Sequence, residues 1–236
     1  MILLTKLILA HLIGDFLLQP RSGLRQKETL TWRSPFLYLH VTVHFLLVLI
    51  ITADAGLWDL ALLIALAHWL IDGCKVHYQT ERSRPAWFFA DQGLHLLAIV
   101  LLWMSRVSPD GLPVLSPAAL WQPDYWPVLL AAVFLTVPAS TIIQHLMMKW
   151  DGAVAEDETA SLKNAGMYIG ILERIFIFIS ILSGFWQTVG FLLAAKSVFR
   201  FGDLTKSGDR KLTEYVLIGT LFSFGLALAA AAFFVV

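Results

Sequence analysis

Four apolar stretches in the first half of the chain each carry two potential metal ligands spaced four residues apart. Four residues is about one helical turn, so both side chains of a pair project from the same face of a helix. Buried polar groups are costly in an apolar environment unless they bond to one another or to a cation. The spacing therefore predicts a metal site inside a membrane. The pairs are His11 and Asp15, His40 and His44, His68 and Asp72, and Asp91 and His95.

The eight side chains form a mixed nitrogen and oxygen donor set. Imidazoles and carboxylates suit zinc, manganese, iron or nickel. Zinc usually takes only three or four protein ligands. The surplus predicts either two metals roughly 3.5–4 Å apart or one metal whose other neighbours orient the ligating imidazoles. We therefore expect one or two divalent transition metals, with zinc ahead of manganese and iron. The alternative is that each pair makes only a polar contact between helices.

The composition indicates that the helices carrying these ligands cross a membrane. Of the 236 residues, 58% are hydrophobic and 14% are charged, against about 25% charged residues in soluble domains. The mean hydropathy is +0.73. We predict an all-α polytopic membrane protein, with residues 1–236 forming a single transmembrane domain of about eight helices. The predicted spans are 1–20, 35–53, 57–74, 86–106, 127–147, 165–183, 184–200 and 214–236.

The basic residues of the predicted loops give the orientation. Lys and Arg concentrate in the loops after the first, third, fifth and seventh spans, whereas the loops on the opposite side contain only Arg106. By the positive-inside rule both termini lie outside the cytoplasm. We expect a multi-pass protein of the bacterial inner membrane. All four ligand pairs then fall in the cytoplasmic half of spans 1 to 4, within residues 1–106, whereas residues 127–236 contain no such pair.

Glycine stands beside the ligands in three of these four spans. Gly14, Gly73 and Gly93 each adjoin a ligand pair or lie within it. Because a glycine has no side chain, it allows neighbouring helices to approach closely. We expect these three positions to bring the ligand-bearing helices together.

A second group of charges lies in the later spans. Glu173 and Arg174 fall in the middle of span 165–183, and Lys196 and Arg200 lie one turn apart in span 184–200. A guanidinium at this depth needs a partner or an aqueous cavity. We expect Arg174, Lys196 and Arg200 to bind an anionic substrate and Glu173 to act in catalysis by transferring a proton. Alternatively, the cations extend to the membrane surface and Glu173 forms a structural salt bridge.

These motifs resemble those of an uncharacterised family of bacterial integral membrane proteins, which carries only a domain-of-unknown-function label. The resemblance implies a membrane protein but no activity. More loosely, the His-x-x-x-Asp helices are similar to those of predicted metal-dependent hydrolases of the inner membrane. The motifs are His11-Leu12-Ile13-Gly14-Asp15-Phe16-Leu17-Leu18-Gln19, the His40 and His44 pair, His68-Trp69-Leu70-Ile71-Asp72, Asp91-Gln92-Gly93-Leu94-His95, Gly170-Ile171-Leu172-Glu173-Arg174, Lys196-Ser197 and Glu214-Tyr215.

Three function classes fit this pattern. The first is a metal-dependent intramembrane hydrolase that acts on an anionic lipid or phosphorylated head group at the cytoplasmic leaflet. The second is a di-iron membrane oxidase or hydroxylase of an acyl chain, and the third is a divalent-cation transporter. A transporter must release its ion, so it should not hold that ion with eight groups. The buried cations favour an anionic substrate, as the hydrolase would have. We therefore favour the hydrolase, with a lipid or lipid-linked substrate and no nucleic-acid partner. The sequence does not indicate an oligomeric state.

Overall fold

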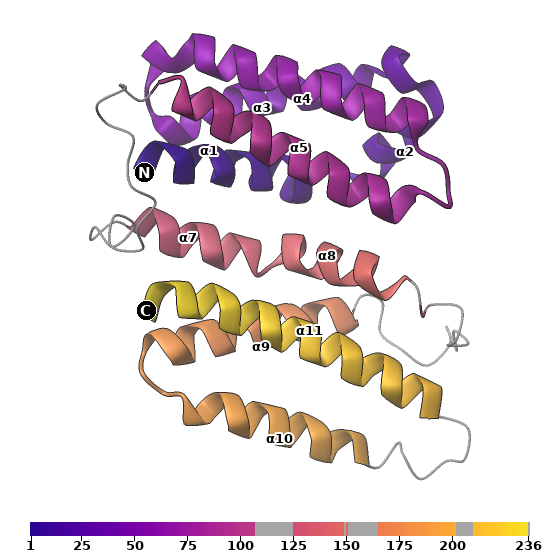
Figure 1. The fold of residues 1–236 in the computed structure, drawn as a ribbon, viewed down its shortest axis with the longest axis vertical. Coiled ribbons are helices and arrows are strands. Elements are labelled where there is room, and N and C mark those ends of the chain that lie inside the picture. The colour runs from indigo at the N-terminus through magenta and orange to yellow at the C-terminus, as the bar shows by residue number, and fades with distance from the viewer. Residues whose placement is uncertain (107–124, 149, 151–164, 202–209, 236) are drawn as a thin grey trace. The chain divides into compact units, whose positions relative to one another are not determined.

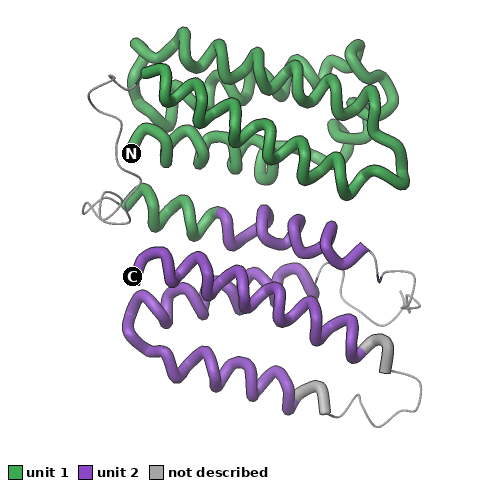
Figure 2. Tube along the Cα trace, in the orientation of Figure 1, with its two compact units in different colours: residues 1–133 green, residues 134–236 purple. Residues whose placement is uncertain are grey.

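Helices form all the regular structure in the part of the chain that the computed structural model describes, which comprises residues 1–106, 125–148, 150, 165–201 and 210–235 (Figure 1). This confirms the predicted all-α class. The chain divides into two compact units, residues 1–133 and residues 134–236 (Figure 2). All eight predicted metal ligands lie in the first unit.

Unit 1 is built around four helices. They are α1 (Ile2–Leu12), which continues into the π-helical turn η1 (Ile13–Leu17), then α3 (Pro35–Thr52), α4 (Trp58–Tyr78) and α5 (Arg84–Met104). Helix α1 contacts α3 and α5, and α4 also contacts both α3 and α5, so the four helices close a ring. Short connections separate α3 from α4 and α4 from α5 and make these neighbours antiparallel.

The interior of this bundle contains an apolar layer and a polar layer. The ligand pairs follow the apolar residues along α1 and α4 but precede them along α3 and α5. Antiparallel neighbours require this order if both layers are to stay level across the bundle. The apolar layer is formed by Leu7, Ala10, Val48, Leu60, Ala61, Ile64, Ile99 and Trp103.

The outer face of the bundle is apolar, which reverses the arrangement of a soluble protein. Ile50 on α3 and Leu70 on α4 are 69% and 54% exposed, whereas His40, His44 and His68 on the same helices are buried. Six helices among the described residues are long and apolar enough to cross a membrane, or up to seven if the bent pair Ile2–Leu17 and Arg21–Arg33 counts as one span. The chain is therefore a multi-pass membrane protein.

The charged stretch between the first two predicted spans, expected only as a loop, forms helix α2 (Arg21–Leu30). It is followed by a short 3-10 turn at Thr31–Arg33, and this segment is bent by 86° from Ile2–Leu17. The sequence between Arg21 and Leu30 is rich in Arg, Gln, Lys, Glu and Leu, which are good helix formers. The bend directs α2 across the end of the bundle that is nearer to the ligand pairs, where it contacts α3 and α4.

Unit 2 begins at the end of α7 (Tyr125–Phe134) and contains α8 (Val137–Met147), α9 (Ala165–Leu182), α10 (Gln187–Phe201) and α11 (Arg210–Val235). Helix α9 contacts α8, α10 and α11. Helices α7 and α8 together cover the predicted span 127–147. The break between them follows from Pro138, which has no N–H to continue the helical hydrogen bonds. At 15 residues, α10 is shorter than the roughly 20 residues of a typical span.

Candidate metal centre

The carboxylate of Asp15 lies at the centre of the polar layer. Its Oδ1 atom is 3.2 Å from His40 Nε2, 3.0 Å from His44 Nε2 and 3.2 Å from His68 Nε2. The two nitrogens His40 Nε2 and His68 Nε2 are 3.0 Å apart. Side chains from η1, α3 and α4 thus direct four potential ligand atoms at one point.

The local backbone explains how Asp15 reaches this point. It lies in the π-helical turn η1, and such turns widen a helix and are frequent at functional sites. The preceding Gly14 lies so close to α3 that a Cβ atom there would collide with the imidazole of His44. At Gly73 a Cβ would collide with the indole of Trp32, whereas at Gly93 it would meet no atom within 4 Å. The expected approach of two ligand-bearing helices therefore exists at Gly14. Gly73 instead adjoins Trp32 of the 3-10 turn, and the expectation is wrong for Gly93.

Two glutamine amides contact the ligands, and one of them, Gln92, connects two ligands. Gln92 Nε2 donates to Asp15 Oδ2 at 2.8 Å, and Gln92 Oε1 accepts from His11 Nε2 at 3.2 Å. Gln19 Nε2 lies 3.3 Å from His40 Nε2. The sequence analysis did not assign either glutamine to the site. Both could have been suspected, because Gln19 ends the first motif and Gln92 adjoins Asp91 within another.

The other two aspartates are each paired with a lysine. Lys27 Nζ donates to Asp72 Oδ2 at 2.5 Å, and Lys75 Nζ donates to Asp91 Oδ2 at 2.7 Å. Lys27 belongs to α2 and is only 2% exposed. The sequence analysis counted both lysines among the cytoplasmic loop charges and did not place them at the site. For Lys75 a signal existed, since it follows Asp72 by about one helical turn.

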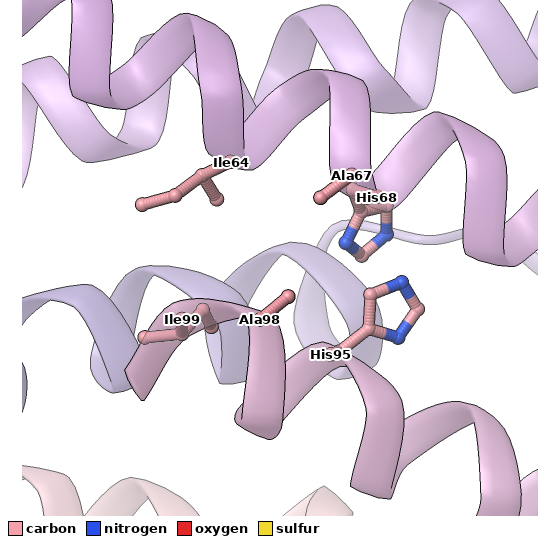
Figure 3. Close-up of a pocket in the computed structure, with 6 residues that line it drawn as sticks. All are labelled: Ile64, Ala67, His68, His95, Ala98 and Ile99. Carbon is pink, nitrogen blue, oxygen red and sulfur yellow. The ribbon is translucent and has the colours of Figure 1, made fainter. Parts of the chain in front are cut away.

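His95 completes a stack of imidazoles. The ring centroids of His44 and His68 are 3.8 Å apart, and those of His68 and His95 are 3.9 Å apart. Neither ring nitrogen of His95 has a hydrogen-bond partner among the described residues, and the same holds for Asp91 Oδ1. His68 and His95 border a small pocket between α4 and α5 (Figure 3), with room for about one water molecule. The other lining residues are Ile64, Ala67, Ala98 and Ile99.

The structure brings all eight predicted ligands into one region. Three groups contain ligand atoms that lie within 4.8 Å of one another. Asp15 and His68 each belong to two of them, so the groups form one connected cluster. That this cluster binds a metal stays a prediction. The groups are His11, Asp15, His44 and His68; His40, His68 and Asp72; and Asp15, Asp91 and His95.

The second predicted set of charges lies in unit 2. Lys196 Nζ donates to Glu173 Oε2 at 2.6 Å, which is the ion pair that the sequence left open as an alternative. Arg174 is buried and donates to Leu135 O, Thr136 O, Ser140 Oγ and Ser223 Oγ at 2.5–3.1 Å. Arg200 lies in α10, and its side chain falls outside the described residues. The catalytic role of Glu173 and the substrate contacts of the three cations stay predictions.

The fold and the site define a multi-pass, all-helical membrane protein with a buried cluster of histidine and aspartate. Residues 3–115 match the family described as "Protein of unknown function (DUF3307)". This confirms the resemblance to a domain-of-unknown-function family. The match includes all eight predicted ligands and does not extend to Glu173, Arg174 and Lys196. No curated protein and no solved structure matches the chain.

Proposed function

We propose that unit 1 binds a divalent transition metal, zinc foremost, through Asp15 and the imidazoles around it. The observation that carries this proposal is the triangle formed by Asp15 Oδ1, His40 Nε2 and His68 Nε2, whose sides are 3.0–3.2 Å. Each imidazole nitrogen has one position in the ring plane, which holds either a proton or a lone pair, and an ionised carboxylate offers only lone pairs.

With Asp15 ionised and both imidazoles neutral, no arrangement of protons makes all three contacts of this triangle favourable. If both histidines donate to Asp15, their two N–H groups face each other. If His68 donates to His40 instead, the lone pair of His40 is used and its nitrogen has no proton to offer Asp15. A cation that accepts electron density from all three atoms removes this conflict. It also offsets the cost of holding a carboxylate away from water.

The distances fit the same interpretation. Zinc binds imidazole nitrogen and carboxylate oxygen at about 2.0–2.2 Å in tetrahedral geometry, which places neighbouring ligand atoms about 3.3–3.5 Å apart. The three sides of the triangle are within a few tenths of an ångström of this spacing. His44 Nε2, at 3.0 Å from Asp15 Oδ1, is available as a further ligand.

For the reaction we propose metal-dependent hydrolysis of an anionic lipid or phosphorylated head group at the cytoplasmic leaflet. A metal in such a site makes a bound water nucleophilic near neutral pH. The pocket beside His68 and His95 can hold a water molecule next to the ligands (Figure 3). A di-iron oxidase of acyl chains is the second candidate, because the eight ligands divide into three overlapping groups.

We assign the proton-accepting role to His95 rather than to Glu173. Both ring nitrogens of His95 are buried without a hydrogen-bond partner among the described residues, and the ring borders the pocket. The carboxylate of Glu173 already accepts from Lys196 at 2.6 Å. Proton transfer requires a group with a free position within hydrogen-bond reach of the water, and His95 meets this requirement within unit 1.

For the topology we propose eight spans, with the metal centre in the cytoplasmic half and both termini outside the inner membrane. Ile2–Leu17 and α10 (Gln187–Phe201) would be the two spans beyond the six long helices. The cationic helix α2 supports this orientation, since it lies at the same end of unit 1 as the ligands. A reporter that is active only outside the cytoplasm should be active at residue 236 and silent near Lys27. The opposite pattern would reject the orientation.

The metal is tested with the double variant His40→Ala/His68→Ala, which removes two corners of the triangle. We expect full-length wild-type protein to retain zinc after purification and the double variant to lose it. His77→Ala is the matched control, because His77 is exposed and lies near the end of the same helix as His68. A double variant with the metal content of the wild type would refute the centre.

The reaction is tested on vesicles that contain an anionic phospholipid, by following release of the head group. Zinc-loaded wild-type protein should be active, and the double variant should be inactive. His95→Gln should keep its zinc and lose turnover. If wild-type protein with bound zinc releases no head group from any anionic lipid tried, the metal centre stands and the hydrolase assignment fails.

A further inference from the structure

We propose that the centre holds one metal ion and that Lys27 and Lys75 are fixed cations occupying the places where further metals would neutralise Asp72 and Asp91. The inference rests on the proposed metal centre and adds its stoichiometry. It decides between the one-metal and two-metal alternatives that the ligand surplus leaves open. It also gives a role to two lysines that the hydrolase proposal does not use.

The first lysine comes from outside the four-helix ring. Helix α2 lies across the end of the bundle that is nearer to the ligand pairs and inserts the ammonium of Lys27 against Asp72, with 2.5 Å between Nζ and Oδ2. Lys27 and Asp72 are 2% and 4% exposed, so this ion pair is shielded from water. His40 Nε2 and Asp72 Oδ2 are 3.7 Å apart, which places the ammonium beside the imidazoles without making it a ligand.

The second lysine makes an equivalent contact within the ring, from α4 to α5. Lys75 Nζ donates to Asp91 Oδ2 at 2.7 Å. A metal would bind such an oxygen at about 2.0–2.2 Å, so an ammonium and a metal ion cannot share that position. Asp91 Oδ1 and the nitrogens of His95 have no hydrogen-bond partner among the described residues, and His95 borders the pocket. We assign them to water rather than to a second metal.

The charges of the cluster also favour a single metal ion. With neutral imidazoles, the three aspartates and two lysines leave one net negative charge, which is carried by Asp15. One divalent ion changes this to a single positive charge, and one hydroxide or one substrate anion then neutralises it. Two divalent ions would leave three positive charges in the membrane interior, where unpaired charge is strongly unfavourable. Of the three aspartates, Asp15 alone has no lysine partner among the described residues.

The experiment counts zinc on the full-length chain in lipid nanodiscs, after stripping with a chelator, reloading with excess Zn²⁺ and washing. We expect one zinc per wild-type chain and two or more per chain of the variant Lys27→Met/Lys75→Met, in which Asp72 and Asp91 have lost their ammonium partners. The matched control is the quadruple variant that also carries Asp72→Asn and Asp91→Asn. Because each lysine is removed together with its aspartate, this control should bind one zinc.

The outcomes separate the two proposals. Two zinc ions on the wild-type chain would overturn the stoichiometry and leave the metal centre intact, whereas none would refute the centre itself. A lysine double variant that still binds one zinc would overturn the role of the lysines. If the double variant does not fold, Lys75→Met alone decides, since its side chain is partly exposed. Two zinc ions on that variant support the inference, and one contradicts it.

Discussion

Replacing Asp15 by Asn is the most direct test of which residue anchors the metal. The substitution keeps the size of the side chain and removes its charge. In the structure Asp15 Oδ1 is the atom on which the Nε2 atoms of His40, His44 and His68 converge at 3.0–3.2 Å. Asp15 is also the aspartate whose charge is not balanced by a lysine. The variant therefore loses both a ligand and the net negative charge of the cluster.

The expected size of the effect follows from a comparison with Gln92. Gln92 contacts Asp15 only through Oδ2, at 2.8 Å, and so acts on the metal through another residue. Loss of such an outer partner typically weakens metal binding about 10–100-fold, or about 1.4–2.8 kcal/mol. We expect Gln92→Leu to fall in this range. Asp15→Asn should exceed it, with more than about 100-fold loss of affinity.

Both affinities can be measured by competition with a fluorescent zinc chelator at one fixed pH. Near-wild-type helical content by circular dichroism would show that each variant is folded. Zinc affinity for Asp15→Asn within tenfold of the wild type would refute the central position of Asp15. A larger loss of zinc affinity for Gln92→Leu than for Asp15→Asn would show that Asp15 is not the ligand and that Gln92 does not act through it.

Two further substitutions test the packing of each unit. Gly14→Ala should displace the imidazole of His44 and weaken zinc binding at least about tenfold, as the loss of a residue that contacts a ligand does. Gly93→Ala should bind zinc as the wild type does, because a Cβ there meets no atom within 4 Å. Equal affinities for the two variants would contradict this. Arg174→Met should lower the free energy of unfolding, by about 1–3 kcal/mol for each buried acceptor, such as Leu135 O, that loses its donor. The zinc content of this variant should be unchanged. An unchanged unfolding temperature with loss of turnover would instead support a substrate contact at Arg174.

The sequence was sufficient to predict the region of the candidate site, because the spacing within each ligand pair and the position of each pair along its helix point to the same place in the bundle. A spacing of four residues places each pair on one helix face, and alternating helix direction brings the pairs to one level. His11 and His68 follow their apolar neighbours, whereas His40 and His95 precede theirs, as antiparallel packing requires. Each of these facts is local, so a single sequence carries enough information to infer them.

The role of Lys27 could not be found in the same way. Lys27 is 45 residues from Asp72 in sequence and reaches it only because the chain bends by 86° before α2. In a sequence, a lysine between two apolar spans indicates orientation, and the positive-inside rule accounts for it fully. Nothing local distinguishes Lys27 from Arg25, which is exposed on the same helix. A long-range ion pair of this kind depends on tertiary structure alone.

The two buried polar regions of the chain differ in how well their contacts are satisfied. Around Arg174 in unit 2, four hydrogen bonds each join an N–H donor to an oxygen acceptor, so every guanidinium nitrogen has a partner within the protein. Around Asp15 in unit 1, nitrogen faces nitrogen at 3.0 Å, and the nitrogens of His95 have no partner among the described residues. Evolution toward structural stability alone would favour the first arrangement, since unsatisfied polar groups are costly in a membrane. The second arrangement leaves polar groups that the described protein atoms do not satisfy, and the proposed metal ion would supply what these contacts lack.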